Sequence, residues 1–340
     1  MKTILQTLNG TPISPPPIWL MRQAGRHLEE YLNLRSRADT FLDFCYSPDM
    51  AVEATLQPIR RYGMDAAILF SDILVIPDAL GQRVSFVPGQ GPQLAPLNGR
   101  ASIKQLDPTN LHDHLAPVYE SIRRLKTLLP EATALIGFAG APWTVITYMI
   151  EGGSSRDFAD TRQWLWSHPK EFEALLDYVT EATIQFLMVQ ARAGADVLML
   201  FDSWASAVPA ERREQIVIAP VRRIVGALRK QGIKQPIIGF PKGIGEGIIS
   251  YAEEAKIDAL AIDHMTDVAW VNKILPKNMP VQGNLDPLSL LVGGSEMRKS
   301  IDHILDSFKD RPHIFNLGHG ITPPTPICNV EQMVQWVRKS

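Results

Sequence analysis

Short apolar runs, rich in β-branched residues, recur along the chain between longer amphipathic stretches, and this alternation constrains the fold more than any other feature. It is typical of strands and helices built around a parallel sheet. The predicted strands span residues 18–21, 66–71, 134–138, 196–201, 236–240, 258–263, 280–283 and 313–317. The clearest predicted helices span residues 47–62, 169–193 and 211–231.

Eight parallel strands with crossover helices are the number that closes a (β/α)₈ TIM barrel. We therefore expect a single α/β barrel domain over residues 1–340, with the active site at the C-terminal ends of the strands. A doubly wound open sheet is the alternative, because strand number alone does not prove closure. Residues 84–96, rich in Gly and Pro, read as a hairpin or loop inserted after the second strand rather than as a domain boundary.

Composition excludes several classes of protein. No apolar run approaches the roughly 18 residues that a membrane span needs, and polar residues interrupt the first ten before a signal-peptide core forms. The net charge of −2 argues against nucleic acid as a partner. The only two cysteines, Cys45 and Cys328, are too few for a disulfide framework and lack the paired spacing of a zinc site. We expect a cytoplasmic protein.

Polar residues that follow the predicted strands are the candidates for a functional site, because the carboxyl ends of parallel strands meet at one face of a barrel. These candidates are Arg22, Gln23, Arg26, Arg35, Asp72, Asp202, Ser203, His264, Asn284, Asp286 and His319.

Arg22 and Arg26 are four residues apart, so a helical or turn-like path would put both guanidinium groups on one side, where they could bind carboxylates bidentately. A solvated basic face is the alternative. Their position directly after an apolar run favours anion binding, because two arginines at a barrel mouth would focus an anion in an otherwise acidic protein.

Asp72, Ser203 and His319 each allow two interpretations. Asp72 ends a buried strand, where a carboxylate would need donors, but Asp is also a favoured helix cap. Ser203 has no GxSxG elbow around it, so a ligand contact is favoured over a nucleophile. His319 lies between Gly318 and Gly320, which permit close backbone approach, and either a structural or a functional role fits it.

Five segments together resemble the uroporphyrinogen decarboxylases: PIWLMRQAGRHLEEY, FSDILVIPDALG, GFAGAPWTVITYMIEGGSS, QGNLDP and NLGHGI. The resemblance runs from about residue 13 to residue 337. It implies a (β/α)₈ barrel, usually a homodimer, that acts without cofactor or metal. It also implies a carboxy-lyase of porphyrin and haem biosynthesis, which converts uroporphyrinogen to coproporphyrinogen by removing CO₂ from four acetate side chains.

The same resemblance implies residue roles. Asp72 would accept the pyrrole N–H groups, and Arg22 and Arg26 would act with it as catalytic residues that hold substrate carboxylates. The remaining implied contacts to the substrate are Gln23, Arg35, Phe70, Tyr148, Phe201, Ser203 and His319, with the two phenylalanines lining the cavity.

Two departures from the family pattern keep other functions open. Residues ITPPTPICNV follow NLGHG, where the family often differs. Related methyltransferases hold zinc with a His-x-Cys pair and a later Cys, whereas His264 is followed by Met265 and Thr266, with only Cys328 remaining. A zinc- or corrinoid-linked methyltransferase and a non-catalytic tetrapyrrole-binding protein are the alternatives. A metal assay tests the first, and a test for turnover tests the second.

Overall fold

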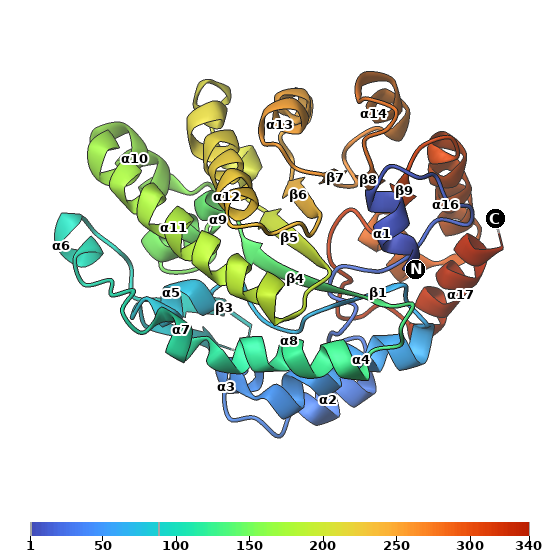
Figure 1. Ribbon diagram of the computed structural model, residues 1–340, viewed down its shortest axis with the longest axis horizontal. Coiled ribbons are helices and arrows are strands. Elements are labelled where there is room, and N and C mark those ends of the chain that lie inside the picture. Colours follow the sequence, from blue (N-terminus) through green and yellow to red (C-terminus); the bar gives the residue numbers. More distant parts are fainter. Residues whose placement is uncertain (1, 88, 340) are drawn as a thin grey trace.

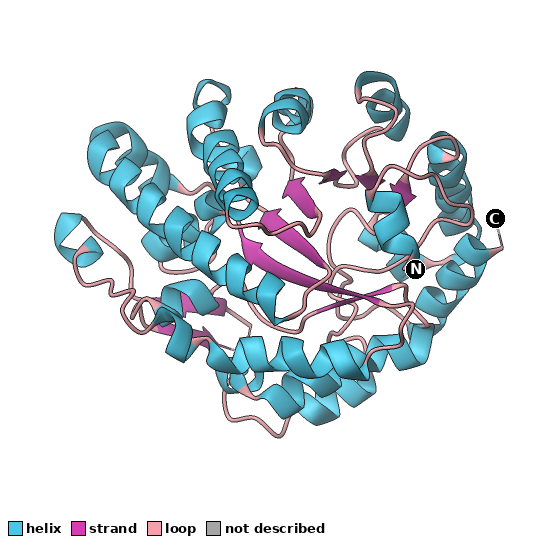
Figure 2. Cartoon of the chain, viewed as in Figure 1, coloured by secondary structure: helices cyan, strands magenta, loops and turns pink. Residues whose placement is uncertain are grey.

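A curled parallel β-sheet forms the centre of the computed structural model, which describes residues 2–87 and 89–339 (Figure 1, Figure 2). Within these residues the sheet has seven strands, all parallel, in the order β1-β4-β5-β6-β7-β8-β9. They are β1 (Ala66–Ile68), β4 (Ala134–Gly140), β5 (Val197–Asp202), β6 (Ile237–Pro241), β7 (Ala259–Ala261), β8 (Val281–Gln282) and β9 (His313–Ile314). Seven of the eight predicted strands are confirmed, several of them shorter than predicted.

The first predicted strand, residues 18–21, is the exception. It forms only an isolated parallel bridge, from Ile18 to Phe315. Its backbone nevertheless bonds to both sides: Phe315 N donates to Pro17 O over 2.9 Å, and Asp65 N donates to Ile18 O over 2.9 Å. Trp19 N also donates to Phe315 O over 3.4 Å, whereas Ile18 N donates to a side chain, the Asp65 carboxylate, over 2.8 Å. A regular ladder cannot extend where a side chain occupies the backbone donor.

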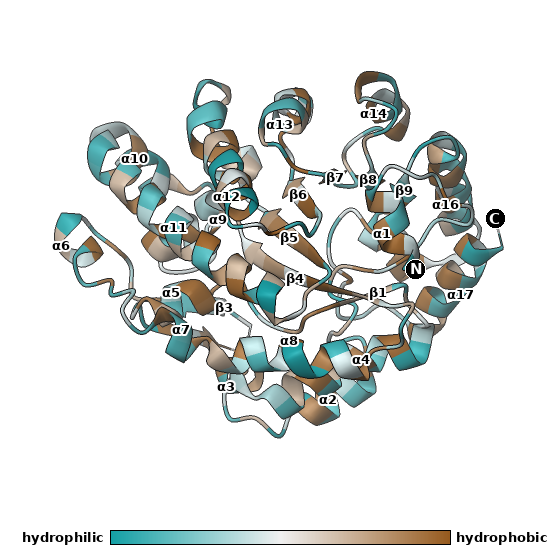
Figure 3. Ribbon diagram, in the orientation of Figure 1, coloured by the Kyte–Doolittle hydropathy of each residue, from teal (hydrophilic) through white to brown (hydrophobic). Residues whose placement is uncertain are grey.

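The inner face of the curled sheet is filled by alternating side chains, as the period of a strand requires. One buried cluster holds Ala134, Ile136 and Phe138 of β4 together with Val197 and Met199 of β5. Figure 3 shows these strands largely in the hydrophobic colour and polar residues on the outer sides of the helices.

Helix α1 (Thr3–Leu8) closes one end of the sheet. Its residues Ile4 and Leu8 belong to the inner cluster. Just before it, Lys2 pairs with Asp196, which directly precedes β5. Helix α1 therefore lies at the amino ends of the strands, and the opposite end is left for the loops that carry the candidate site.

The predicted helices are confirmed with one local difference. Residues 47–62 and 169–193 form α4 (Pro48–Tyr62) and α11 (Pro169–Ala193). Residues 211–231 begin as a 3₁₀ turn, η2 (Ala210–Arg212), and a π-helical segment, η3 (Glu214–Ile218), before α12 (Ala219–Lys230). Pro220 explains this irregular start, because proline lacks the N–H that would bond the carbonyl four residues earlier.

The remaining helices lie around the outside of the sheet (Figure 1). They are α2 (Glu29–Arg35), α3 (Phe41–Tyr46), α5 (Val75–Ala79), α6 (Arg100–Ile103), α7 (Leu111–His114), α8 (Ala116–Leu128), α9 (Pro142–Glu151), α10 (Ala159–Ser167), η1 (Ala205–Ala207), η4 (Gly245–Gly247), α13 (Ile248–Glu254), α14 (Val268–Ile274), α15 (Pro287–Val292), α16 (Gly294–Phe308) and α17 (Ile327–Arg338). None of the described helices is both long and apolar enough to cross a membrane.

The predicted hairpin is also present. Strands β2 (Val84–Val87) and β3 (Gly91–Leu94) pair antiparallel. The hairpin is fastened to α9, since Leu94 N donates to Gly152 O over 2.8 Å, and it touches α3 where Phe86 meets Phe41 at 4.6 Å between ring centroids. It therefore stands beside the loops of the candidate site.

Candidate active site

Two distant motifs interlock where the candidate site begins. Met21 N donates to the Asn316 side chain over 3.0 Å, and Ile321 N donates to Met21 O over 3.0 Å. The same Asn316 oxygen accepts from Leu317 N over 2.8 Å. The segments MRQAGR and NLGHG, which carry four of the predicted site residues, are therefore fixed to each other.

Arg22 lies in the turn that follows Met21. Its backbone is left-handed, with φ of 61°, which is unusual for a residue other than glycine. Its side chain is exposed and passes directly over Gly320, where a Cβ would come within 2.3 Å of Arg22 Cδ. A left-handed arginine packed on a glycine backbone is a constrained conformation of the kind that clusters at functional sites.

Asp72 lies between β1 and α5, partly accessible but deep in the molecule. Its Oδ1 accepts from Leu74 N over 2.9 Å, and within the described chain no other group bonds to the carboxylate. Burial raises the pKa of Asp72, while the Leu74 N–H and the charge of Arg22 oppose the rise. The carboxylate thus supports the local turn, as the capping interpretation expected, and still keeps acceptor capacity beside an arginine.

Arg26 precedes α2, and Arg35 is the last residue of this helix. Arg26 is exposed, and Arg35 is half-buried, with its guanidinium donating to Ala38 O over 2.8 Å and lying 6.0 Å from the Phe41 ring centroid. Burial raises the pKa of Tyr31 to about 12, and the charges of both arginines oppose the rise. Arg22 and Arg26 occupy a turn rather than a helix, and their common orientation stays a prediction.

The two predicted cavity phenylalanines differ in their surroundings. Phe70 is buried in an aromatic cluster, 4.5 Å from Phe44 and 5.6 Å from Tyr31 between ring centroids. Phe201 is partly accessible and meets Phe240 edge-on at 6.1 Å. Phe240 in turn lies 6.3 Å from the ring of His319, so Phe201 belongs to an aromatic row that leads to the histidine.

His319 is a neutral imidazole held in one tautomer. Its Nδ1 accepts from Gly320 N over 2.6 Å, which leaves the proton on Nε2. Burial, together with the charges of Arg22, Lys242 and His264, lowers the pKa of His319 to about 3. At neutral pH this side chain therefore offers an N–H donor without a positive charge.

Ser203 lies on a loop fixed by Asp202, the last residue of β5. Asp202 Oδ1 accepts from Thr144 Oγ1 over 2.5 Å, and the same hydroxyl accepts from Trp204 N over 3.1 Å. Burial raises the pKa of Asp202 to about 7, although the Thr144 hydrogen bond opposes the rise. Tyr148 of α9 faces this loop, with its ring centroid 6.2 Å from that of Trp204.

Gln23 differs from the expectation of a carboxylate contact. It has no exposed surface, and both ends of its amide serve the backbone: Oε1 accepts from Leu20 N over 3.1 Å, and Nε2 donates to Ala66 O over 3.0 Å. The family resemblance implies a substrate contact for Gln23, but a position after a strand does not say which way a side chain points. In this structure Gln23 joins the first run to β1.

Comparison with known proteins decides the family. A family model described as "Uroporphyrinogen decarboxylase (URO-D)" matches residues 1–340. The chain belongs to this family. It is 52% identical to the uroporphyrinogen decarboxylase of Maricaulis maris, over 99% of this chain and 97% of the relative. The Hyphomonas neptunium protein of the same name is 48% identical, over 100% of this chain and 99% of the relative.

Solved structures support the fold of this uroporphyrinogen decarboxylase family member. A methyltransferase from Methanosarcina mazei superposes with a TM-score of 0.80 at 18% identity, covering 100% of this chain and 99% of that chain. A B12-independent methionine synthase from Shewanella superposes with a TM-score of 0.56 at 11% identity, covering 85% of each chain. At these identities the likeness shows the α/β fold alone.

The described residues contain no cluster of three or more His, Cys, Asp or Glu side chains placed to hold a metal ion. His264 follows β7, where Asp263 accepts from Met265 N over 2.8 Å and from Gly243 N over 2.7 Å. Asp263, the residue before His264, therefore connects the loop after β7 to the loop after β6.

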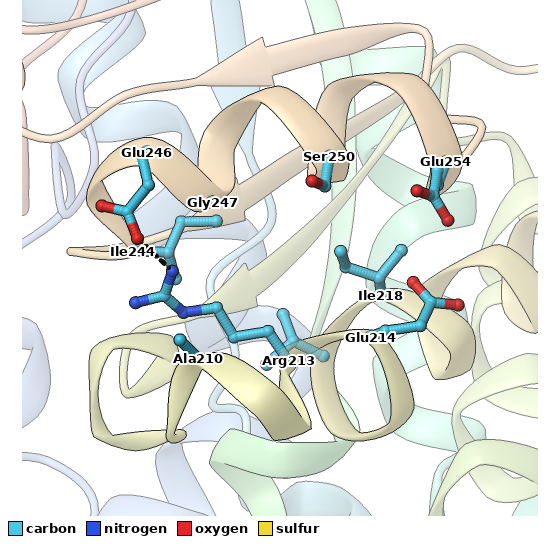
Figure 4. A pocket seen from close by; sticks show the side chains of 10 residues that line it. Ala210, Arg213, Glu214, Ile218, Ile244, Glu246, Gly247, Ser250 and Glu254 are labelled. Carbon is cyan, nitrogen blue, oxygen red and sulfur yellow. Dashed lines mark hydrogen bonds and ion pairs between the residues drawn. The ribbon is translucent and has the colours of Figure 1, made fainter.

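A separate pocket of about 290 Å³ lies between η3 and α13 (Figure 4). Arg213 there donates to Glu246 over 2.9 Å, and Arg222 pairs with Glu214 over 2.6 Å. The loop that follows β6 leads into this region and presents Glu246, whose charge disfavours a phosphate.

Sequence reasoning missed Lys242 and Trp204. Lys242 directly follows β6, as Ser203 directly follows β5, so a search for polar residues after each predicted strand would include it. Its Nζ lies 5.7 Å from the Trp204 ring centroid. The position of Asp202 after a predicted strand makes it a candidate, but its hydrogen bond with Thr144, 58 positions away in the sequence, has no sequence signal.

Proposed function

We propose that this chain is a uroporphyrinogen decarboxylase, a carboxy-lyase that converts uroporphyrinogen III to coproporphyrinogen III in haem biosynthesis. Family membership over residues 1–340 supports the reaction class. The observation that carries the proposal is the hydrogen bonding of Asp72: within the described residues its carboxylate accepts only from Leu74 N, over 2.9 Å, so it keeps acceptor capacity, and the charge of Arg22 opposes the rise in its pKa.

The chemistry that the site must support needs only protons and charge stabilisation. A proton adds to a pyrrole carbon next to the acetate, and the cationic ring accepts the electron pair of the breaking bond as CO₂ leaves. A second proton then completes the methyl group, and the ring loses the first. Each acetate thus becomes a methyl group with net uptake of one proton, and four acetates react. No cofactor is required for these steps.

Asp72 is the group that we assign to the developing cation. An anion held in place beneath the pyrrole N–H groups would accept their hydrogen bonds and stabilise positive charge where it forms in the transition state. Arg22 and Arg26 would bind carboxylates of the substrate by charge-assisted hydrogen bonds. Tyr148, Ser203 and His319 would contact the carboxylates or the ring, and the neutral His319 Nε2–H suits a carboxylate acceptor.

We further propose that the sheet closes into a (β/α)₈ barrel in a single domain. Residues 18–21 would take the eighth position, because Ile18 bridges to Phe315 beyond β9 and accepts a hydrogen bond from Asp65 N before β1. A homodimer and a cytoplasmic location complete the proposal. Two free cysteines, Cys45 and Cys328, are compatible with a reducing compartment.

The test is anaerobic incubation of the purified chain with uroporphyrinogen III, with products separated by their number of carboxylates. We expect stepwise appearance of species with seven, six and five carboxylates and accumulation of coproporphyrinogen. A methyltransferase or a tetrapyrrole carrier would leave the substrate unchanged. Analytical ultracentrifugation tests the dimer separately.

A further inference from the structure

Lys242 is a cation at the strand ends that has no assigned role. It directly follows β6, and its backbone N–H donates to Asp202 O over 3.1 Å, which fixes it beside the end of β5. The side chain is half-buried. Within the described residues, no carboxylate lies close enough to form an ion pair with its ammonium group.

Aromatic rings support the Lys242 side chain. Its Nζ lies 5.7 Å from the Trp204 ring centroid, and Trp204 itself is packed 5.0 Å from Phe158 and held by a hydrogen bond from Trp143 Nε1 to Trp204 O over 2.8 Å. A cation over a fixed indole face is oriented without being neutralised. The ammonium group therefore keeps its hydrogen-bond donors for an anion.

Lys242 and Arg22 lie on different sides of the site. Strand β6 is the middle strand of the seven-stranded order, whereas the run that precedes Arg22 bonds next to the two edge strands. In a curled sheet the middle strand and the edges face each other across the interior (Figure 1). The charges of both cations reach the imidazole of His319: burial is the largest cause of its lowered pKa, and the charges of Arg22 and Lys242 add to it.

We propose that Lys242 binds a carboxylate side chain of the substrate from the side of the site opposite Arg22. This inference rests on the proposed function. Uroporphyrinogen carries four acetates and four propionates around its macrocycle, so cations on one side alone would leave distant carboxylates unpaired. The flexible lysine stem suits a substrate that must present each acetate in turn, because an ammonium accepts carboxylates from several directions.

The test compares Lys242→Met with Lys234→Met in the anaerobic assay. Methionine keeps most of the side-chain volume beside Trp204 and removes the charge, and Lys234 is an exposed lysine before the amino end of the same strand. We expect KM to rise about tenfold or more in Lys242→Met, with a smaller change in kcat, and no change in Lys234→Met. Lys242→Arg should recover most of the affinity. Equal KM values for the two methionine variants would overturn the proposal.

Starting from intermediates with fewer carboxylates distinguishes the two kinds of carboxylate. If Lys242 holds an acetate, the effect of Lys242→Met disappears once that acetate has become a methyl group. If it holds a propionate, all four steps are affected equally. An effect that is absent from every step would count against the inference.

Binding measurements separate this inference from the proposed function. Binding of uroporphyrin III, the oxidised form of the substrate that keeps all four acetates and all four propionates, can be compared between the wild type and Lys242→Met without turnover, and a wild type that binds but does not decarboxylate uroporphyrinogen would contradict only the proposed function. In the wild type, bound uroporphyrin III should protect Lys242 from amine-reactive labelling and leave Lys234 reactive. Equal labelling of Lys242 with and without ligand would overturn the inference, even if no Lys242 variant folds.

Discussion

The Arg22 side chain lies directly on the backbone of Gly320: a Cβ at position 320 would come within 2.3 Å of Arg22 Cδ and 2.6 Å of Arg22 Cγ. Gly320→Ala should therefore displace the arginine without opening the core, because the exposed guanidinium end is free to move. We expect kcat/KM for uroporphyrinogen to fall about tenfold or more, the usual effect of losing a charge-assisted contact. Thermal unfolding should change little.

Gly318→Ala is the matched control on the other side of His319. There a Cβ would meet backbone rather than a movable side chain, 2.1 Å from His264 N. Overpacking against backbone typically costs about 1 to 3 kcal/mol, so this variant should melt at a lower temperature. If Gly320→Ala keeps wild-type kinetics, Arg22 does not need its present position for activity.

Arg26→Lys is expected to lose more activity than its retained charge suggests. A guanidinium binds a carboxylate at two points and an ammonium does not. The loss in kcat/KM should be about tenfold or more, measured beside Arg100→Lys, an exposed arginine on α6. Near-normal kinetics for Arg26→Lys would place Arg26 outside the site.

The strands and most helices could be predicted because buried elements have a recognisable pattern of apolar residues in the sequence. Residues 134–138 and 196–201 are apolar runs, and α11 (Pro169–Ala193) begins at a proline and ends before a glycine. The irregular first run could not be predicted, because the Asp65 side chain that replaces its ladder bond comes from 47 residues away. The irregular segment η3 could have been predicted from Pro220, because a proline interrupts the hydrogen bonds of a regular helix.

The candidate site was partly readable for the same reason. A residue's place after a strand is a sequence property, so the strand-end positions of Ser203 and His319 were readable. The direction of a side chain depends on tertiary contacts, which is why the buried amide of Gln23 and the loop-fixing role of Asp202 were not foreseen.

The pH dependence of stability should include a measurable contribution from His313. Burial lowers its pKa to about 4, and its Nε2 lies 2.7 Å from Gly283 O. Between about pH 6.5, the ordinary pKa of histidine, and about pH 4, the unfolded chain binds a proton at His313 and the folded chain does not. The contribution of His313 to the free energy of unfolding is therefore fully present above about pH 6.5 and is lost as the pH falls towards about 4. The slope is at most about 1.4 kcal/mol per pH unit.

His313→Gln isolates this contribution, because glutamine keeps an N–H donor but does not titrate, and the other buried groups are unchanged. Between about pH 7 and pH 5 the free energy of unfolding of the wild type should fall by roughly 2 kcal/mol more than that of the variant. Chemical denaturation at several pH values measures the difference. Parallel curves would show that folding does not lower the pKa of His313.

Chelators should leave the activity unchanged. A zinc site of the methyltransferase type needs several ligands together, and no such cluster occurs among the described residues. Elemental analysis of active protein after dialysis against a chelator is the measurement. One zinc per chain, lost together with activity, would favour the methyltransferase hypothesis.

Turnover by Asp72→Asn tests the central claim most directly. Asparagine keeps the size and an oxygen that accepts from Leu74 N, but it removes the charge that would stabilise the cationic ring. The matched control is Asp107→Asn, since Asp107 makes the same kind of turn, accepting from Thr109 N over 2.8 Å on an exposed loop. We predict that folded Asp72→Asn loses about 10² to 10³ in the rate of uroporphyrinogen decarboxylation, whereas Asp107→Asn keeps the wild-type rate. A rate for Asp72→Asn within about threefold of the wild type, less than the roughly 10²-fold loss of such a group, would contradict the account and reduce Asp72 to a turn-stabilising residue.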